Sequence, residues 1–371
     1  MKRGRIIYIG PFVMPDGNAT AHRVLQNAKI FEKVGYPSIF IELRNGNNDS
    51  YTDKRTYFGF DVWKVPYNDK KKRLIIEYSY ILNCISQYSD AVAIVGYNLP
   101  STVTLMLKKI CSRLKLKYIV DSTEWYSSIH LSLYKRPFFA FDTFITMKIL
   151  NKRSDGIIVI STYLKNYYKN NKKVVFLPPM VDKSENIWKD QHSHDNTDVN
   201  FVFSGTLRAG KDNLKLCVDC IQSIDTSILD IYGVTKTEYL NHYNLNELDV
   251  DDRKIKFHGV VSHVDSIHAL KNADYLLLIR ENSRKNNAGF STKLVESISC
   301  GTPIISTNTS DVASLIERYA CGYIVSFDYK QLYEEIKIIS QKERYRLSKE
   351  CSNVFDFNNY IGEVRNFLDT I

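Results

Sequence analysis

The chain has 371 residues, of which 44% are hydrophobic and 25% are charged, with a net charge of +9. This length suits two domains of ordinary size, and this composition is typical of a folded globular protein rather than a disordered one. Apolar runs such as residues 157–160 and 275–279 are far shorter than the roughly 20 residues of a membrane-spanning helix, and the N-terminal residues show no secretory-signal pattern. We therefore expect a cytoplasmic protein.

The seven cysteines are irregularly spaced and odd in number, which argues against a disulfide framework and favours a reducing compartment. Cys217 and Cys220 form one CxxC pair inside a predicted helix, with no second pair to complete a metal site. We predict that both are buried structural residues and that the protein binds no metal.

The charge is divided unequally along the chain. Residues 1–182 contain 28 Lys and Arg against 14 Asp and Glu, whereas the remainder contains 22 against 27, so the two halves carry about +14 and −5. An anionic partner of the first half is expected, and an acidic membrane surface is favoured over nucleic acid because no nucleic-acid-binding module accompanies the charge. Residues 70–73 and the helix-like stretch 105–117 would form a basic amphipathic surface, although a plain solvated helix face explains them equally well.

Short apolar runs alternate with helix-period segments through residues 1–182. Such alternation is typical of a parallel sheet with helices on both faces, so we predict a doubly wound, Rossmann-like domain in this half. The expected strands are residues 5–9, 38–41, 92–95, 118–120, 156–160 and 174–177.

A polar stretch over residues 183–198 predicts an interdomain linker, and the same alternation restarts in residues 199–355. The second set of expected strands is 200–203, 228–232, 255–257, 275–278, 303–306 and 323–325. A C-terminal helix over 356–371 is expected to pack back on the first domain. Two such domains facing a central cleft would bind ligands at the carboxyl ends of their strands.

The segment 286–303 has the pattern of an anion site. Gly289 allows close approach of the backbone, Ser291 can cap the helix that begins there, and the free amides of that helix end attract phosphate. Lys293 adds a cation, and Glu296 one turn later can accept hydrogen bonds from a ribose diol. An ordinary capped helix with a surface Lys and Glu is the alternative.

A second candidate anion site lies at residues 203–211, directly after the first strand of the second domain. Arg208 and Lys211 are three residues apart among glycines, a spacing that would direct both cations at a diphosphate. A solvated turn with unrelated charges would give the same pattern without any function.

With these segments in this order, the chain resembles glycosyltransferase family 4, the retaining GT-B enzymes of the group 1 type, over nearly its whole length. The resemblance is carried by the glycine-containing loop 10–17, by 155–161 with the Pro-x-x-x-Asp segment 178–182, by the turn 204–211, and by the helix 293–303. The last two segments are the specific ones.

The resemblance implies a GT-B fold and a nucleoside diphosphate sugar as donor substrate, with a UDP-sugar favoured and no cofactor. By motif position, the donor diphosphate would be held by Arg208 and Lys211, and Glu296 would bind the ribose. His258 would lie near the base, which the family reads mainly through backbone atoms. The remaining residues implied near the donor phosphates are Gly17, Gly289, Phe290, Ser291, Thr292 and Lys293.

Two departures from the family pattern concern the transferred sugar. The family commonly has a Glu eight positions before the ribose Glu, whereas this chain has Ala288 there, so Glu281, Asn286 or Asn287 would have to substitute for it.

The family's first domain often has a His after the fourth or fifth strand, but this chain has none at that turn. Asp121 or Glu124 would then face the reacting carbon or act as base, with Trp125 as a flat surface for a sugar. Alternatively, Asp121 is a structural residue at the end of its strand that caps the following helix. His22 and Arg23 are further candidates.

The hypothesis is retaining, metal-independent transfer of a sugar to a hydroxyl, with same-face attack and the leaving diphosphate stabilised by Arg208, Lys211 and the helix amides. The basic first half favours a lipid-linked glycan acceptor at the inner membrane face, as in surface polysaccharide synthesis. Two alternatives share the donor site. Ala288 points to a non-catalytic, nucleotide-sugar-binding partner subunit, and the same fold also serves nucleotide-sugar epimerases.

Overall fold

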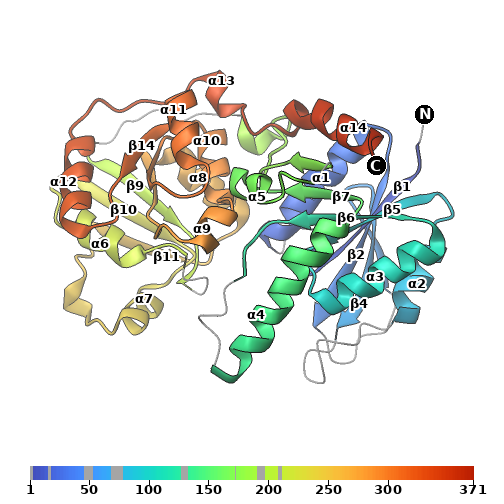
Figure 1. Ribbon diagram of the computed structural model, residues 1–371. Coiled ribbons are helices and arrows are strands. Elements are labelled where there is room, and N and C mark those ends of the chain that lie inside the picture. Colours follow the sequence, from blue (N-terminus) through green and yellow to red (C-terminus); the bar gives the residue numbers. More distant parts are fainter. Residues whose placement is uncertain are drawn as a thin grey trace. The chain divides into compact units, whose positions relative to one another are not determined.

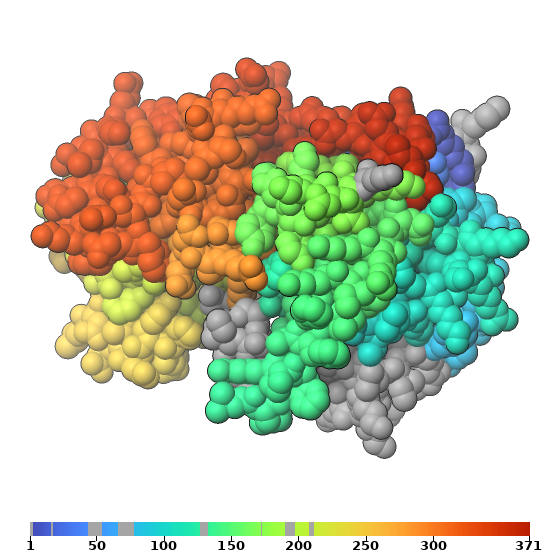
Figure 2. Space-filling model, viewed as in Figure 1, coloured from blue at the N-terminus to red at the C-terminus, as the bar shows by residue number. Residues whose placement is uncertain are grey.

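The computed structural model describes residues 3–15, 18–45, 53–67, 78–126, 133–171, 173–189, 197–207 and 211–371. The chain divides into two compact units. Figures 1 and 2 show the chain coloured by residue number from blue to red. Unit 1 comprises Met1–Met180 with Phe357–Ile371, and unit 2 comprises Val181–Asp356. Unit 2 is built on a parallel sheet and unit 1 on a mostly parallel one, and each unit is described separately below.

Within the described residues, unit 1 has an eight-stranded sheet in the order β3-β4-β2-β1-β5-β6-β7-β8. All neighbours pair in parallel except β3 and β4, which are antiparallel. The strands are β1 Arg5–Gly10, β2 Ser38–Asn45, β3 Asp53–Tyr57, β4 Phe60–Tyr67, β5 Ala91–Tyr97, β6 Lys117–Ser122, β7 Gly156–Val159 and β8 Val174–Phe176. The helices are α1 Ala19–Lys33, α2 Tyr78–Ser86, α3 Ser101–Leu114, α4 Arg136–Phe144, α5 Thr162–Tyr167 and α14 Ile361–Asp369.

Alternation along β1 explains why helices cover both faces of this sheet. Ile6 and Tyr8 belong to the core cluster that includes residues of α1 and α14, whereas Ile7 and Ile9 belong to the cluster that includes residues of α2 and α3. All four side chains are fully buried. A strand buried on both faces has to be apolar throughout, which is why the run 5–9 is so easily recognised in the sequence.

The hairpin formed by β3 and β4 was not expected from the sequence. Phe58 and Gly59 both have positive φ angles, of 51° and 84°, between the paired ends Tyr57 and Phe60. Two central residues with positive φ are typical of the type I′ turn that joins antiparallel strands. The hairpin adds an edge to a sheet that was otherwise predicted correctly.

Within the described residues, unit 2 has a six-stranded sheet in the order β11-β10-β9-β12-β13-β14, with all neighbours parallel. The chain reverses its direction of travel across the sheet between β9 and β12, as in a doubly wound fold. The strands are β9 Val199–Ser204, β10 Ser227–Tyr232, β11 Ile255–Gly259, β12 Tyr275–Leu278, β13 Ile304–Thr307 and β14 Gly322–Val325. The helices are α6 Leu214–Gln222, α7 Lys236–Tyr243, α8 His263–Asn272, α9 Arg284–Ala288, α10 Thr292–Ser299, α11 Val312–Tyr319, α12 Tyr329–Ser340 and α13 Lys349–Ser352.

The segment expected to be a linker is partly packed on unit 2. Trp188, in a single turn of helix at Asn186–Trp188, is buried in the same core cluster as Leu276 and Leu294. Lys183 donates a hydrogen bond from Nζ to the carbonyl of Ser299 at 2.8 Å. Residues 190–196 of the expected linker lie outside the described residues.

Helix α3, which the sequence assigned to a basic amphipathic surface, keeps its apolar face in the core. Leu107 and Ile110 are fully buried, so only Leu105 and Leu114 are exposed among its leucines and isoleucines. The structure therefore favours the solvated-helix interpretation, with basic side chains on the outer face of a core helix. The other basic segment, residues 70–73, lies outside the described residues.

The last helix belongs to unit 1 although it ends the chain. Val364 and Phe367 of α14 join the core cluster that includes Val24 and Ala28 of α1. Cys217 and Cys220 lie buried in α6, as expected from the sequence. Among the described residues, no helix combines the length and the apolar character required to cross a membrane.

Candidate functional site

A buried ion cluster lies at the carboxyl ends of β9 and β12. Asp212 follows β9 and pairs through a backbone bridge with Arg280, which follows β12. The Asp212 carboxylate also forms ion pairs, with Arg280 Nε at 2.5 Å and with Lys293 Nζ at 2.5 Å. Because β9 and β12 flank the point where strand order reverses, this cluster occupies the edge at which open α/β sheets bind their ligands.

The cluster is strongly charged and poorly hydrated. The Asp212 side chain is only 7% exposed, and burial alone would raise its pKa, but Lys293 and Arg280 outweigh burial and hold the pKa well below its usual range. Burial lowers the pKa of Lys293, and the neighbouring Asp212 opposes that lowering. Two cations therefore share one carboxylate, which leaves an excess of positive charge where an anion can be bound.

The ion cluster makes a specific contribution to acid stability. Because the folded pKa of Asp212 lies below the unfolded value of about 3.9, its contribution is fully present above that value and is lost as the pH falls toward the folded pKa. We expect Asp212→Asn to cost about 2–3 kcal/mol of unfolding free energy near pH 6 and about 1 kcal/mol less near pH 3, where the unfolded carboxylate is protonated but the folded one is still ionised. Urea unfolding across this range measures the difference.

The control for this prediction is Asp219→Asn, since Asp219 forms a 2.6 Å ion pair with Lys215 on α6 with both side chains more than a quarter exposed. That variant should show a small penalty at both pH values. A penalty for Asp212→Asn that stays constant from pH 6 to pH 3 would contradict the prediction.

Glycines make room for the cluster. A Cβ atom at Gly205 would lie 2.0 Å from Lys293 Nζ, which also lies 5.1 Å from the ring centre of Phe203. A Cβ at Gly233, whose φ is +94°, would lie 2.4 Å from the carbonyl oxygen of Gly205. Only glycine fits both positions without movement, so the ends of β9 and β10 can pack this closely.

Helix α10 presents its N-terminus beside the same cluster. Ser291 is the N-cap, and its Oγ accepts a hydrogen bond from the backbone N–H of Leu294 at 3.4 Å. The N–H groups of Thr292 and Lys293 stand in the first turn, where a helix offers them no internal acceptor. The helix end and the Lys293 side chain therefore present positive charge together.

Gly289 ends the preceding helix, and Phe290 packs against the core of unit 2. The Gly289 N–H donates to the carbonyl of Lys285 at 3.4 Å, and its own carbonyl accepts from Ser310 Oγ at 2.6 Å. The ring of Phe290 packs edge-on against Phe355, with ring centres 5.8 Å apart. Gly289 is therefore engaged at both backbone groups, so its amide is already used within the protein.

Glu296 is oriented by a residue from another helix. His263 Nε2 lies 3.1 Å from Glu296 Oε1, and the Glu296 side chain is 20% exposed. The imidazole in turn lies edge-on to the buried ring of Trp188, with centres 6.4 Å apart. Glu296 therefore keeps an accessible carboxylate with one oxygen already positioned.

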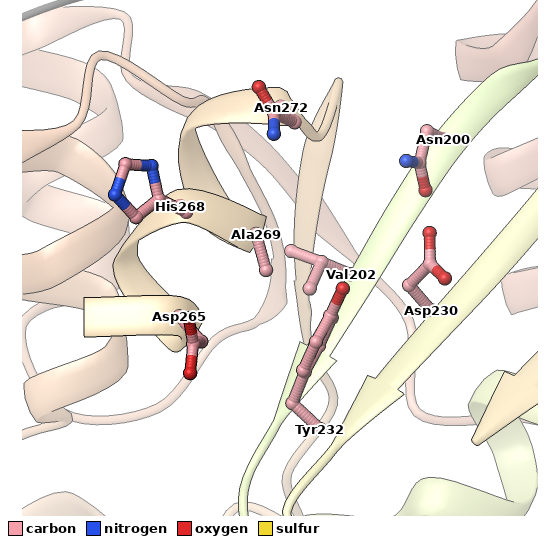
Figure 3. A pocket seen from close by; sticks show the side chains of 8 residues that line it. All are labelled: Asn200, Val202, Asp230, Tyr232, Asp265, His268, Ala269 and Asn272. Carbon is pink, nitrogen blue, oxygen red and sulfur yellow. The ribbon is translucent and has the colours of Figure 1, made fainter. Parts of the chain in front are cut away.

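His258 is held by two neighbours on the same face of the sheet. Its Nε2 lies 2.6 Å from Asp230 Oδ1, and its ring stacks on Tyr232 with centres 4.3 Å apart and planes at 8°. Asp230 and Tyr232 also line a pocket of about 330 Å³ between the sheet and α8 (Figure 3). Because Asp265 adds a second carboxylate to this pocket, it suits a diphosphate poorly.

Of the other residues predicted to contact the donor, the structure describes Lys211 but not Gly17 or Arg208. Gly17 and Arg208 lie outside the described residues. Lys211 is partly buried and directly precedes Asp212, so its backbone leads into the ion cluster. The described residues thus bring Lys293, the α10 N-terminus and Lys211 to one edge of the sheet.

Ala288, where the family has a Glu, is fully buried. Asn286 donates from Nδ2 to the carbonyl of Glu281 at 2.9 Å, and Asn287 Oδ1 accepts from the N–H of Ser310 at 2.9 Å. Both amides thus hold the loop in place. The side chain of Glu281 is exposed, so it is the loop acid that is free to reach a ligand.

Asp121, a candidate catalytic residue of unit 1, lies at the end of β6 and is completely buried. Arg23 forms two hydrogen bonds to its carboxylate, at 2.8 and 3.2 Å, and a third to the carbonyl of Leu177 at 2.8 Å. Tyr8 donates a short hydrogen bond to Asp121, and Asn27 Nδ2 lies 3.3 Å from the same oxygen. These donors surround the carboxylate, and the geometry favours a structural role for Asp121 and Arg23.

Glu124 and Trp125 follow β6 and are partly exposed. The ring of Trp125 lies edge-on to Tyr167, with centres 4.9 Å apart, so its orientation is set by α5. His22 lies on α1 next to the buried Arg23. Of the two acids proposed for unit 1, Glu124 is the accessible one.

Asp212, Arg280 and His263 were not selected from the sequence, although they organise the site. Arg280 directly follows the apolar run 275–279, and a charged residue at the end of a buried strand is a usable signal in a doubly wound fold. Asp212 and His263 have no such signal, because only the fold shows that they face Lys293 and Glu296.

The region that contains this site matches a known family model. Residues 198–342 match the family model described as glycosyl transferases group 1. No curated protein sequence matches the chain.

Solved structures match over the whole chain. Sucrose-phosphate synthase from Thermosynechococcus elongatus has a TM-score of 0.75 at 12% identity, covering 99% of this chain and 98% of that one. Anabaena HepE in complex with UDP has a TM-score of 0.70 at 12% identity, with full coverage of both chains. The lipopolysaccharide outer core galactosyltransferase WaaB has a TM-score of 0.66 at 16% identity, covering 98% and 99%.

At these identities the structural likeness establishes the fold. The chain has two parallel-sheet domains of the GT-B class, as expected from its sequence. The family match covers the sheet and most of the helices of unit 2, including the ion cluster and α10. Membership of glycosyltransferase family 4 itself stays a prediction.

Proposed function

We propose that the protein transfers a sugar from a nucleoside diphosphate sugar to a hydroxyl group, with retention of configuration. The observation that carries this proposal is the cluster of Asp212, Arg280 and Lys293 beside the N-terminus of α10, within the region that matches the glycosyl transferase model. A UDP-sugar is favoured, since the similar HepE structures contain UDP or UDP-glucose.

Lys293 is suited to hold the donor diphosphate. Its ammonium group has three donors, and Asp212 accepts from one of them at 2.5 Å. The proposed diphosphate would accept from the others and from the N–H groups of Thr292 and Lys293, while Arg208 and Lys211 approach from the loop after β9. Charge grows on this group as the glycosidic bond breaks, so fixed donors favour the transition state over the bound donor.

The nucleoside would lie against neighbouring elements. Glu296, with one oxygen set by His263, would accept from the ribose hydroxyls through the other. The base would lie near His258, whose ring is immobilised by Asp230 and Tyr232.

We further propose that these protein cations, rather than a metal ion, offset the charge of the leaving diphosphate. Attack by the acceptor on the same face of the sugar, with the leaving phosphate taking the acceptor proton, accounts for retention without a protein nucleophile. Glu124 is then the accessible unit 1 acid that would orient the acceptor hydroxyl.

The proposed acceptor is a lipid-linked glycan at the inner face of a membrane, as in surface polysaccharide synthesis. The support is the charge of about +14 in residues 1–182, which favours an anionic surface. The proposed location is cytoplasmic, with peripheral attachment to that membrane.

Donor binding is tested by thermal unfolding with UDP, ADP, GDP and their sugars. A ligand at about 100 times its Kd adds about 2.7 kcal/mol to the native state, or roughly 3–4 °C in Tm for a chain of 371 residues that unfolds as one unit. We expect one nucleotide series to give this shift and Arg208→Ala to abolish most of it. The matched control is Arg253→Ala, because Arg253 is 90% exposed in the same unit.

A lack of response to every nucleotide would overturn the donor site. A full response without transfer or hydrolysis of the sugar would instead favour a non-catalytic subunit, the alternative that the buried Ala288 supports. Conversion of the donor to another nucleotide sugar without any acceptor would identify an epimerase.

A further inference from the structure

An apolar surface of unit 1 has no place in the chemistry proposed above. It lies on the helical run 133–153, which consists of a turn at Leu133–Lys135, helix α4, a π-helical stretch at Ile145–Leu150 and a final turn at Asn151–Arg153. Large apolar side chains are exposed along its first half by 48–79%. They are Leu133, Tyr134, Phe138, Phe141 and Phe144, and together they are called the α4 apolar face.

The spacing shows that these side chains form one stripe. Tyr134, Phe138, Phe141 and Phe144 follow one another at intervals of four, three and three residues, which places them on one side of a helix. Monomeric proteins rarely expose a contiguous group of aromatic side chains, and such patches mark interaction sites. The stripe is therefore a candidate surface for a partner.

The opposite side of the same run is anchored in unit 1. Asp142 accepts hydrogen bonds from the N–H of Ser101, at 3.0 Å, and from its hydroxyl, which holds α4 at the N-terminus of α3. Thr143 is buried, and Phe139 packs edge-on against Tyr126. The α4 apolar face is thus the outer side of a fixed helix rather than a loose end.

The π-helical stretch continues the buried side of α4. The N–H of Asn151 bonds to the carbonyl of Thr146, five residues earlier, so each turn there is wider than in α4. Thr146, Met147 and Leu150 are buried three, four and seven residues after Thr143, which is the only buried residue of α4, so the second half of the run is the more deeply buried. The π-helical stretch therefore anchors the run, and α4 is free to project from the unit. Figure 1 shows α4 extending beyond the strands of its sheet.

Basic residues accompany the apolar face at both ends. Lys135 lies 5.5 Å from the ring centre of Tyr134, and Lys148 lies 5.2 Å from that of Phe144, with both ammonium groups exposed. Lys109 and Arg113, on the outer face of α3, add further exposed positive charge in the same unit. An apolar, aromatic stripe with lysines beside it matches the interfacial helices that lie in a membrane surface.

We propose that the α4 apolar face docks unit 1 on a membrane containing anionic lipids, with the aromatic side chains among the acyl chains and the basic residues at the headgroups. Charge complementarity selects this occupant. A second copy of the chain packed on this face about a twofold axis would bring its own Lys135 and Lys148 against these, which is unfavourable. The inference rests on the proposed function only for the expectation that the acceptor is membrane-bound.

The test is co-sedimentation with vesicles of phosphatidylcholine, with and without phosphatidylglycerol, using the full-length protein without nucleotide. We expect binding to the anionic vesicles that weakens with salt, and a loss of at least about tenfold in partition coefficient for the double variant Phe138→Ser, Phe141→Ser. The matched control is Leu248→Ser, because Leu248 is 97% exposed in unit 2. This variant should bind as the wild type does.

Binding of the double variant equal to that of the wild type, or no binding of the wild type, would overturn the proposal. So would a wild-type dimer in sedimentation equilibrium that the double variant dissociates, because the face would then belong to a second copy. The UDP-induced Tm shift separates this outcome from failure of the proposed function. A Tm shift with UDP but no binding to vesicles would overturn the docking surface and leave the donor site standing. Binding to vesicles without a Tm shift would overturn the donor site and leave the docking surface standing.

Discussion

Replacing Lys293 by alanine is expected to lower kcat/KM for the donor by about 10²–10³-fold, equivalent to roughly 2.7–4 kcal/mol of transition-state stabilisation. The proposed role of Lys293 is to donate to a diphosphate whose charge grows during the reaction. The Lys293 side chain is 19% exposed, so water can replace its charge only partly. The rate of UDP release from the UDP-sugar that stabilises the wild type measures the effect.

The fold should survive this change, because Asp212 keeps its ion pair with Arg280 at 2.5 Å. Lys215→Ala is the control, since Lys215 also pairs with an aspartate in unit 2, but on the surface of α6. It should leave kcat/KM within about twofold. A Lys293→Ala enzyme as active as this control would exclude Lys293 from the donor site.

Replacing Asp121 by asparagine is expected to cost about 3–5 kcal/mol of unfolding free energy, because it leaves the Arg23 charge buried without a counter-ion. Both side chains are almost inaccessible, at 0% and 2% exposure, so water cannot compensate. Urea unfolding at neutral pH measures the loss.

This experiment also decides between the two interpretations of Asp121. Glu124→Gln is the control, as Glu124 follows the same strand but is partly exposed, and we expect its stability to stay near that of the wild type. If Asp121→Asn unfolds like the wild type but has lost its activity, a catalytic role replaces the structural one.

The sequence was a good guide to the fold wherever strands are buried on both faces. The run 5–9 is apolar at every position except its first, because α1 covers one side of β1 and α2 and α3 cover the other. The hairpin of β3 and β4 escaped prediction because its strands lie toward an edge of the sheet and mix polar with apolar residues.

For the candidate site, the sequence indicated the residues that local rules identify. Ser291, Lys293 and Glu296 stand in one short stretch whose helix-capping pattern is readable without a structure, and the structure places Ser291 at the N-cap of α10. The sequence could not show that Asp212 pairs with both Arg280 and Lys293, because these residues are up to 81 positions apart.

The apolar faces of α3 and α4 show the same limit of sequence analysis. Leu107 and Ile110 give α3 the pattern of a surface amphipathic helix, yet both side chains are buried in the core of unit 1. Phe138, Phe141 and Phe144 of α4 have a similar period and stay exposed, because the run 133–153 contacts the core through the opposite face, at Thr143, Thr146, Met147 and Leu150. Periodicity reveals an apolar face, but not what covers it.

The sequence by itself determined two doubly wound domains, the position of the candidate anion-binding motif and the basic character of the first half, because strand runs, caps and charge are local properties of the chain. Only the tertiary structure decided that Asp121 is enclosed by Arg23, Tyr8 and Asn27, and that Asp212 links two cations. It also decided that α4 exposes a continuous apolar stripe, whereas α3 buries Leu107 and Ile110 in the core. Burial and ion pairing depend on distances between residues remote in sequence, and packing of the sheets and helices sets those distances.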